Sequence, residues 1–362
     1  MKSMRSKAKL NSLLWVILVA VFALGVVFVE NGLGYYARRI ILLGGIYLIL
    51  SMGLNIIYGF TGMFSLGQYG FMAIGAYVTA LCYLSPAAKG KQFYVQGIAG
   101  WVQNIHMGFL PALLVGTAVA TIIGAILGYI LISKLGGDYL AIATLCFAEI
   151  VRVVINYFVK ITNGPTGLTG LTGVVGSYWI FGCVLFTVLL AARLAKTSHG
   201  RAMFSIRENE IAAESCGINL VKHKVLAFAL GCMLSGLGGA LMAFWSGTMD
   251  PTMFRMSQNF VVMMIVVIGG RGNITGTCVM SFAVAGLVEW LSVVEKPITI
   301  LGWRYPGIYG VKMLAFAVLL LIAIINFKRG LFRREFSPSI FYERPKFLER
   351  MLSGRKGGNG NA

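Results

Sequence analysis

The sequence predicts an all-α, polytopic integral membrane protein with about ten transmembrane helices. The mean hydropathy of its 362 residues is +0.81. Only 12% of the residues are charged, whereas soluble proteins carry about 25%. Apolar segments as long as a bilayer requires, about 20 residues, recur along the chain. Together these features exclude a soluble domain of any size.

The expected spans lie near residues 13–29, 40–58, 67–84, 110–132, 138–158, 177–195, 224–245, 257–270, 274–294 and 308–327. The first span follows a basic stretch, as the apolar part of a signal peptide does. No A-x-A-like cleavage site precedes Glu30, so an uncleaved helix is favoured. Segments 257–270 and 274–294 are joined by a short glycine-rich turn. They are either two spans or one broken or re-entrant element.

Basic residues gather in three regions: a tail at 1–12, a loop at 196–224 and a second tail at 328–362. The positive-inside rule places all three in the cytoplasm. That requires an even number of spans between them, and six before the loop and four after it satisfy the requirement. The transmembrane domain is expected at 13–327. The net charge of +19 is interpreted as a topology signal, and no nucleic-acid partner is expected.

A polar island from His199 to Lys224 interrupts the apolar sequence. Helix-forming residues predict one helix over Arg201–Ala213, ended by Gly217. Spacings of three and four residues place Met203, Ile206, Glu210 and Ala213 on one face of that helix. A charged helix of this kind is typical of a surface that docks another protein, although it could instead rest on anionic lipid.

A glycine-rich break near 59–67 interrupts apolar sequence at membrane depth. Irregular backbone is tolerated there only when it is buried in protein or lines a wet cavity. Broken helices often carry transported substrates, because freed backbone groups bind polar ligands. Thr61, Ser65 and Gln68 are therefore candidate pathway residues, with a buried structural kink as the alternative.

Glu149 and Arg152 lie three residues apart in the fifth span, hence on one helix face. Charges within a membrane are costly and indicate a functional site by default. The alternative is an ion pair that only neutralises itself. Three further polar residues are expected near a pathway: Asn55, Tyr139 and Thr144.

The segment Lys160–Gly176 is rich in glycine and threonine. It is expected at an outer mouth or lid, where Asn163 and Thr166 would meet the substrate, or else it is a plain connector. Glycine and alanine also recur every four residues at Gly116, Ala120 and Gly124. This spacing predicts close packing of helices, within the chain more than between two copies.

The absence of several motifs excludes classes of function. The chain has no GxxxxGK[ST] phosphate loop, no GxSxG nucleophile elbow and no ladder of carboxylates for ion coupling. Its six cysteines and three histidines form no metal-binding pattern. We therefore expect neither an enzyme nor a cofactor or metal site, but a conduit whose energy source lies elsewhere.

Several strings, in order from about residue 40 to 327, resemble the LivM-type permeases of branched-chain amino acid ABC importers. They are Asn55…Gly59-Phe-Thr-Gly62…Ser65-Leu-Gly67-Gln68, Gly137-Asp-Tyr-Leu-Ala-Ile-Ala-Thr-Leu145, Glu149-Ile-Val-Arg152, Thr162-Asn-Gly-Pro165-Thr166-Gly167, Gly200-Arg201-Ala202, Ile206-Arg207-Glu208-Asn209-Glu210-Ile211-Ala212-Ala213-Glu214, Gly217-Ile218-Asn219 and Gly269-Gly270-Arg271-Gly272.

The resemblance implies a permease in the inner membrane, surrounded by lipid. Its expected partners are a second homologous permease subunit, two cytoplasmic ATPase subunits and a periplasmic substrate-binding protein. Loop 196–224 becomes the coupling loop that the ATPase moves. The residues it implies for that contact are Arg201, Arg207, Glu208, Glu210, Ala212, Ala213 and Gly217.

The expected substrates are branched-chain or related hydrophobic amino acids. The loop departs from the general importer pattern of Glu-Ala-Ala, three residues and Gly, because the glutamate comes one residue early at Glu210. A urea or short-chain amide permease of the same superfamily remains an alternative. An ion-coupled secondary transporter is a more distant one.

Overall fold

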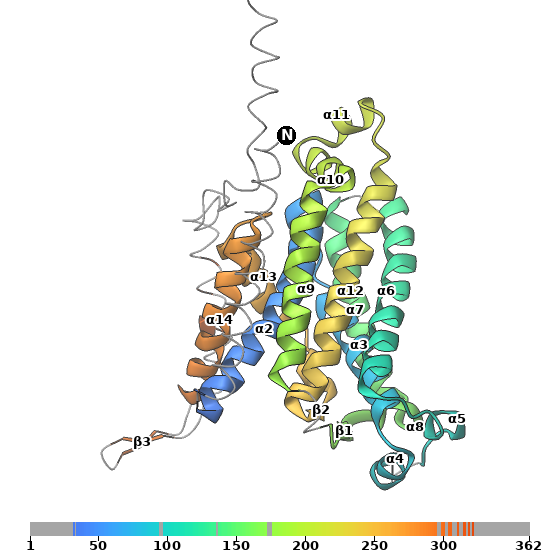
Figure 1. The fold of residues 1–362 in the computed structure, drawn as a ribbon, viewed down its shortest axis with the longest axis vertical. Helices are drawn as coiled ribbons and strands as arrows, with labels where there is room; N and C mark the ends of the chain where they lie inside the picture. Colours follow the sequence, from blue (N-terminus) through green and yellow to red (C-terminus); the bar gives the residue numbers. More distant parts are fainter. Residues whose placement is uncertain are drawn as a thin grey trace, which may run out of the picture.

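The computed structural model describes residue 32, residues 34–93, 97–134, 137–171, 176–294, 298–300 and 303–305, and the single residues 310, 314, 315, 318 and 321. The predicted spans 13–29 and 308–327 and both predicted tails lie outside the continuously described residues. The described part of the chain is predominantly helical (Figure 1).

Six helices in the described part are long and apolar enough to cross a membrane. Each overlaps a predicted span, so the all-α membrane architecture is confirmed. They are α2 (Tyr35–Leu54) continued by the π-helix η1 (Asn55–Phe60), α6 (Phe109–Lys134), α7 (Gly137–Tyr157), α9 (Ser177–Lys196), α12 (Leu220–Ser246) and α14 (Ile274–Val294).

Two further helices are shorter than the spans predicted for them. Helix α3 (Gln68–Tyr83) has 16 residues and α13 (Ser257–Gly269) has 13. At about 1.5 Å per residue, neither reaches across the roughly 30 Å hydrocarbon core. Non-helical residues precede each of them, at 62–67 and 255–256. The predicted break near 59–67 is therefore present, and 257–294 consists of two helices, the first of which is short.

Helix α12 forms the centre of the bundle and packs against α2, α3 and α6. Glycines permit this close approach. A Cβ at Gly128 of α6 would lie 2.6 Å from the Phe228 ring of α12, closer than van der Waals contact. The small-residue stripe of α6 is buried within the chain (Gly116, Ala120, Gly124 and Gly128), so the predicted intramolecular packing is confirmed.

The two ends of the bundle differ (Figure 1). At one end lie α10 (Ser198–Glu208) and α11 (Glu210–Ser215), which connect α9 to α12. At the other lie α4 (Pro86–Gln92), α5 (Gly100–Gln103), α8 (Val159–Thr162), η2 (Gly164–Thr166) and the antiparallel pair β1 (Leu168–Thr169) and β2 (Thr248–Met249). A second antiparallel pair, β3 (Ile298–Ile300) and β4 (Trp303–Tyr305), follows α14.

A buried lysine organises the β1–β2 end. The Lys89 side chain of α4 is fully buried, and its Nζ donates to the carbonyl oxygens of Val102 (2.9 Å) and Ile105. Burial lowers the pKa of this amine because water no longer solvates the charge. These bonds satisfy the carbonyls around α5 and hold that short helix against α4.

Candidate functional site

An open cavity of about 530 Å³ lies between α7 and the start of α13. It is lined by Glu149, Arg152, Arg255, Met256, Ser257 and Phe260. We call it the α7–α13 cleft. Two of the predicted pathway residues, Glu149 and Arg152, therefore share one site with residues that are distant in sequence.

Glu149 joins the two sides of the α7–α13 cleft. Its Oε2 accepts from Arg152 Nε at 2.8 Å and lies 2.7 Å from Arg152 Nη2. Its Oε1 accepts from the backbone N–H of Met256 at 3.1 Å. Met256 immediately precedes α13, so the carboxylate sits at the positive end of that helix dipole. The ion pair predicted within α7 is present, and it also ties α7 to α13.

Arg255 adds a second guanidinium to the cleft. Among the described residues it is exposed and forms no ion pair. Met256 and Phe260, which are 36% and 39% exposed, supply apolar walls. One carboxylate thus shares the cleft with two guanidinium groups, and the cleft carries an excess positive charge. Such a site can hold a small molecule with a carboxylate, an amine and an apolar side chain.

Sequence reasoning missed the α13 side of the cleft. A signal was available, because the run Asp250–Ser257 places polar and proline residues between two apolar segments. Only the fold shows that this run returns to Glu149. In the described residues no group of three His, Cys, Asp or Glu side chains could hold a metal ion.

The loop between α9 and α12, which we call the coupling loop after its predicted role, differs from the single helix predicted over Arg201–Ala213. Asn209 is extended, with φ −160° and ψ 113°, and divides the segment into α10 and α11. The Asn209 side chain accepts from Ala212 N at 3.0 Å and so caps α11. Asparagine at a helix start is a strong capping signal, which the single-helix prediction overlooked. The stop at Gly217 is confirmed by its φ of +79°.

The face predicted to dock a partner points partly inward. Met203, Ile206 and Ala213 are buried, at 0%, 1% and 3% exposure. Ile211, by contrast, is 78% exposed at the tip of the loop. Ile211 is not among the predicted contacts. The predicted contacts that are exposed are Arg201, Arg207, Glu208, Glu210, Ala212 and Gly217.

Arg207 turns back to bond the π-helix η1. Its Nη1 donates to the Gly59 carbonyl of η1 at 2.7 Å, and its Nη2 lies 2.7 Å from Glu208 Oε1. Glu208 itself is largely exposed. The coupling loop is therefore bonded directly to the π-helix that precedes the break.

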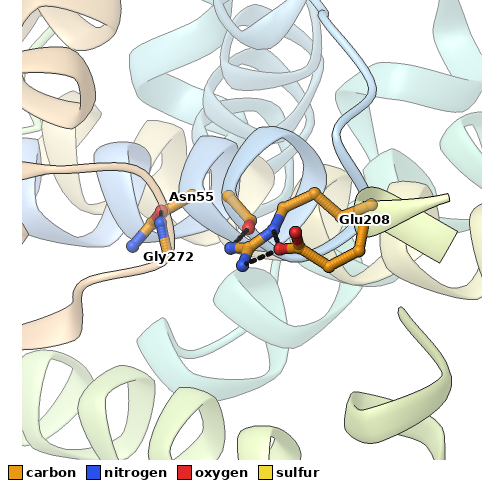
Figure 2. A network of polar contacts seen from close by, with 5 residues as sticks. Asn55, Glu208 and Gly272 are labelled. Atoms are coloured by element: carbon orange, nitrogen blue, oxygen red, sulfur yellow. Dashed lines mark hydrogen bonds and ion pairs between the residues drawn. The ribbon is translucent and has the colours of Figure 1, made fainter. Parts of the chain in front are cut away.

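Asn55 connects the same region to the turn between α13 and α14 (Figure 2). Its Oδ1 accepts from Gly272 N at 2.8 Å, and its Nδ2 donates to Thr277 Oγ1 at 3.1 Å. Gly272 has φ +80°, and a Cβ there would lie 2.8 Å from Arg207 Nη1. Loop, π-helix and turn thus meet at one point, which we call the Arg207 contact.

The other predicted pathway residues lie outside the α7–α13 cleft. Thr61 donates to Ile57 O at 2.6 Å, and buried Thr144 accepts from Leu66 N at 3.1 Å. Both therefore stabilise backbone around the break. Ser65 is also buried there, whereas Tyr139 is 67% exposed on the outside of α7.

Asn163 and Thr166 belong to a folded loop at the β1–β2 end. Asn163 adopts φ +63°, donates to Gly167 O at 2.7 Å and accepts from Thr166 Oγ1 through its own carbonyl at 2.6 Å. Gln92 holds the adjoining Thr169 through two hydrogen bonds of 2.8 and 3.0 Å. These contacts give both residues a structural role in this loop.

A family model described as "Branched-chain amino acid transport system / permease component" matches residues 36–325. The chain belongs to this family. Together with the six membrane-length helices, this makes it a multi-pass membrane protein and a permease component, not an enzyme.

Relatives of this permease component include LivM proteins. The "High-affinity branched-chain amino acid transport system permease protein LivM" of Salmonella typhimurium is 33% identical over 262 residues, 63% of this chain and 57% of the relative. The probable LivM of Methanocaldococcus jannaschii is 27% identical over 261 residues, 66% and 76%. The chain thus spans little more than half the length of the Salmonella relative. LivH of Escherichia coli K12 is 23% identical over 269 residues, 69% and 82%. No solved structure matches the chain significantly.

Proposed function

We propose that this chain is a permease subunit of an ABC importer that moves branched-chain or related hydrophobic amino acids into the cytoplasm. The observation that carries the proposal is the chemistry of the α7–α13 cleft, where acidic, basic and apolar side chains surround one open cavity. The names of the LivM relatives point to the same substrate class.

The cleft suits a zwitterion with an apolar side chain. Arg255 lacks an ion-pair partner among the described residues, and a guanidinium binds a carboxylate through two parallel hydrogen bonds. Glu149 offers a carboxylate to an ammonium group, and Met256 and Phe260 offer surface to an aliphatic chain. Urea or a simple amide would leave the charge of Arg255 uncompensated. The cleft therefore favours amino acids over the amide alternative.

The position of these charges also favours a second permease subunit. Glu149 lies near the middle of the 21-residue α7, and its side chain is 32% exposed. A charge at that depth is unfavourable against lipid. This face of α7 therefore borders a water-containing pathway and not lipid. A homologous permease subunit would form the other wall of that pathway. In Escherichia coli, LivM and LivH carry the name of one transport system, which matches a pair of related permeases.

We place the α10–α11 end in the cytoplasm, together with both chain termini, because basic residues gather there. Two ATPase subunits dock on the exposed tip around Ile211, and a periplasmic binding protein delivers substrate at the β1–β2 end. The Arg207 contact then carries movement of the loop to η1 and to the α13–α14 turn.

The test begins with the full chain purified from its membrane without crosslinking. We expect an ATPase pair and a second permease to copurify, and the reconstituted complex to take up leucine only when ATP is supplied. Uptake of urea in place of leucine would contradict the substrate class. Uptake by the chain alone, driven by an ion gradient, would contradict the ABC mechanism.

A further inference from the structure

The starts of the two short helices meet inside the bundle. Gln68 is the first residue of α3, and Asn259 is the third residue of α13. The backbone N–H of Tyr69 donates to Asn259 Oδ1 at 3.1 Å. Ser235 of α12 donates to Gln68 Oε1. We call Gln68, Asn259 and Ser235 the amide junction.

Two donors at the amide junction have no acceptor. Gln68 and Asn259 are only 1% and 3% exposed, yet neither Gln68 Nε2 nor Asn259 Nδ2 has a hydrogen-bond partner in the described structure. The amide of Asn259 cannot simply be reversed, because its oxygen already accepts from Tyr69 N–H. Buried polar groups are almost always paired, so these two unpaired donors, on residues at the starts of two helices that contact each other, require an explanation.

The junction is electropositive as well as rich in donors. Each helix directs the positive end of its dipole toward it, and anions bind favourably at such ends. Discontinuous membrane helices commonly use this arrangement to bind the carboxylate of a substrate. Amide N–H groups and two helix starts together call for a ligand that offers negatively charged oxygen.

The junction also lies next to the α7–α13 cleft. Asn259 stands between Ser257 and Phe260, which line the cleft, but its side chain is directed to α3. Non-helical residues precede both α3 and α13, so either helix start can shift without bending a continuous helix. Separation of the two starts would expose both donors to a molecule arriving from the cleft.

We propose that the amide junction is a second binding station, at which the carboxylate of the transported amino acid is held by Gln68 Nε2 and Asn259 Nδ2 after it leaves the α7–α13 cleft. The inference rests on the proposed function for the identity of the substrate. While the two helix starts are in contact, as in this structure, the unpaired donors destabilise that contact. The carboxylate of the substrate supplies the acceptor that the donors lack. The station is thus empty when the helix starts touch and filled when they part.

Two substitutions in the reconstituted complex test the station. Asn259→Asp keeps the acceptor for Tyr69 N–H but removes the free donor. Gln68→Met removes the amide at similar volume and leaves no polar group unpaired at that position. Thr79→Val is the matched control, because Thr79 Oγ1 is another buried group of α3 without a partner in the described structure, away from the junction.

ATP-driven leucine uptake and the thermal midpoint are measured for each variant. We expect Asn259→Asp and Gln68→Met to lower the maximal uptake rate about tenfold or more, while Gln68→Met leaves the thermal midpoint unchanged or higher. Thr79→Val should transport normally. Normal uptake by both junction variants would overturn the station, as would losses of uptake that merely follow a lowered thermal midpoint. Failure of the unmodified complex to take up leucine would instead overturn the proposed function.

Discussion

Two pairs of glutamate and arginine, one within the membrane helices and one in the coupling loop, look alike in sequence and act differently in the structure. Glu149–Arg152 and Arg207–Glu208 both form ion pairs of 2.7 Å between near neighbours. In the first pair the carboxylate reaches another element, at Met256 N. In the second the guanidinium does so, at Gly59 O.

In each pair, one residue joins two structural elements and the other balances the charge of the first. Glu149 and Arg207 are the joining residues. Arg152 turns its charge to the α7–α13 cleft, and Glu208 is 73% exposed. Losing Glu149 therefore leaves Arg152 without its counter-charge, in a cleft that already holds Arg255, which forms no ion pair among the described residues. Losing Glu208 removes an exposed carboxylate, while Arg207 keeps its bond to the Gly59 carbonyl. Glu149 and Arg207 should thus be far more sensitive to substitution than their partners.

The largest effect is expected at Glu149. Glu149→Gln should lower leucine uptake at least about tenfold and destabilise the protein by about 1–2 kcal/mol, because Arg152 loses its counter-charge in a half-buried site. Adding Arg152→Gln should restore most of the stability but not the uptake. Thermal unfolding and uptake of the single and double variants measure this. Additive losses of stability in the double variant would show that the pair is not coupled.

An overpacked coupling loop should come next. Ala213 is the buried residue of α11, so Ala213→Leu should cost about 1–3 kcal/mol and displace the loop. Uptake should fall more than ATP hydrolysis, measured in the same proteoliposomes. Ala212→Leu at the exposed neighbouring position is the control for added bulk alone. Equal effects of the two would mean that burial of Ala213 is unimportant.

A smaller effect is expected at the Arg207 contact. Gly272→Ala must place a Cβ at φ +80° and beside Arg207 Nη1, which should cost about 1 kcal/mol. Coupled uptake should fall severalfold. Gly286→Ala in α14 is a suitable control, because a Cβ there meets nothing within 4 Å. A variant Gly272→Ala with normal uptake and stability would argue against tight contact at this point.

The smallest effect is expected at the salt bridge between Glu210 and Lys224. The two charges are 2.6 Å apart, but Glu210 is 53% exposed. Glu210→Gln should change the stability by about 0.5 kcal/mol, because Glu210 is on the exposed side of the pair and the amide oxygen of Gln can still accept from Lys224, whose side chain is only 14% exposed. Thermal unfolding at low and high salt checks this. A larger loss of stability, equal at low and high salt, would show that Glu210 is as sensitive to substitution as Glu149 and Arg207.

Much of the fold follows from local sequence, while the site does not. Hydropathy identifies the membrane-length helices, and the spacing of Glu149 and Arg152 predicts their ion pair, because both are properties of one segment. The bond from Glu149 to Met256 joins residues 107 apart in sequence, and the bond from Arg207 to Gly59 joins residues 148 apart. Such contacts depend on how α3 and α13 stop short of a full span. Apolar composition alone cannot reveal this, since α13 is as apolar as the full spans.

The central claim is that Arg207, and not Glu208, links the coupling loop to the membrane helices. Leucine imported per ATP hydrolysed, measured in one reconstituted complex, tests it most directly. For Arg207→Ala we predict continued hydrolysis with uptake per ATP lowered at least about tenfold, since the bond to Gly59 is lost. Glu208→Gln should keep a ratio close to that of the unmodified complex. Equal ratios for the two variants, whether both normal or both lowered, would contradict the account.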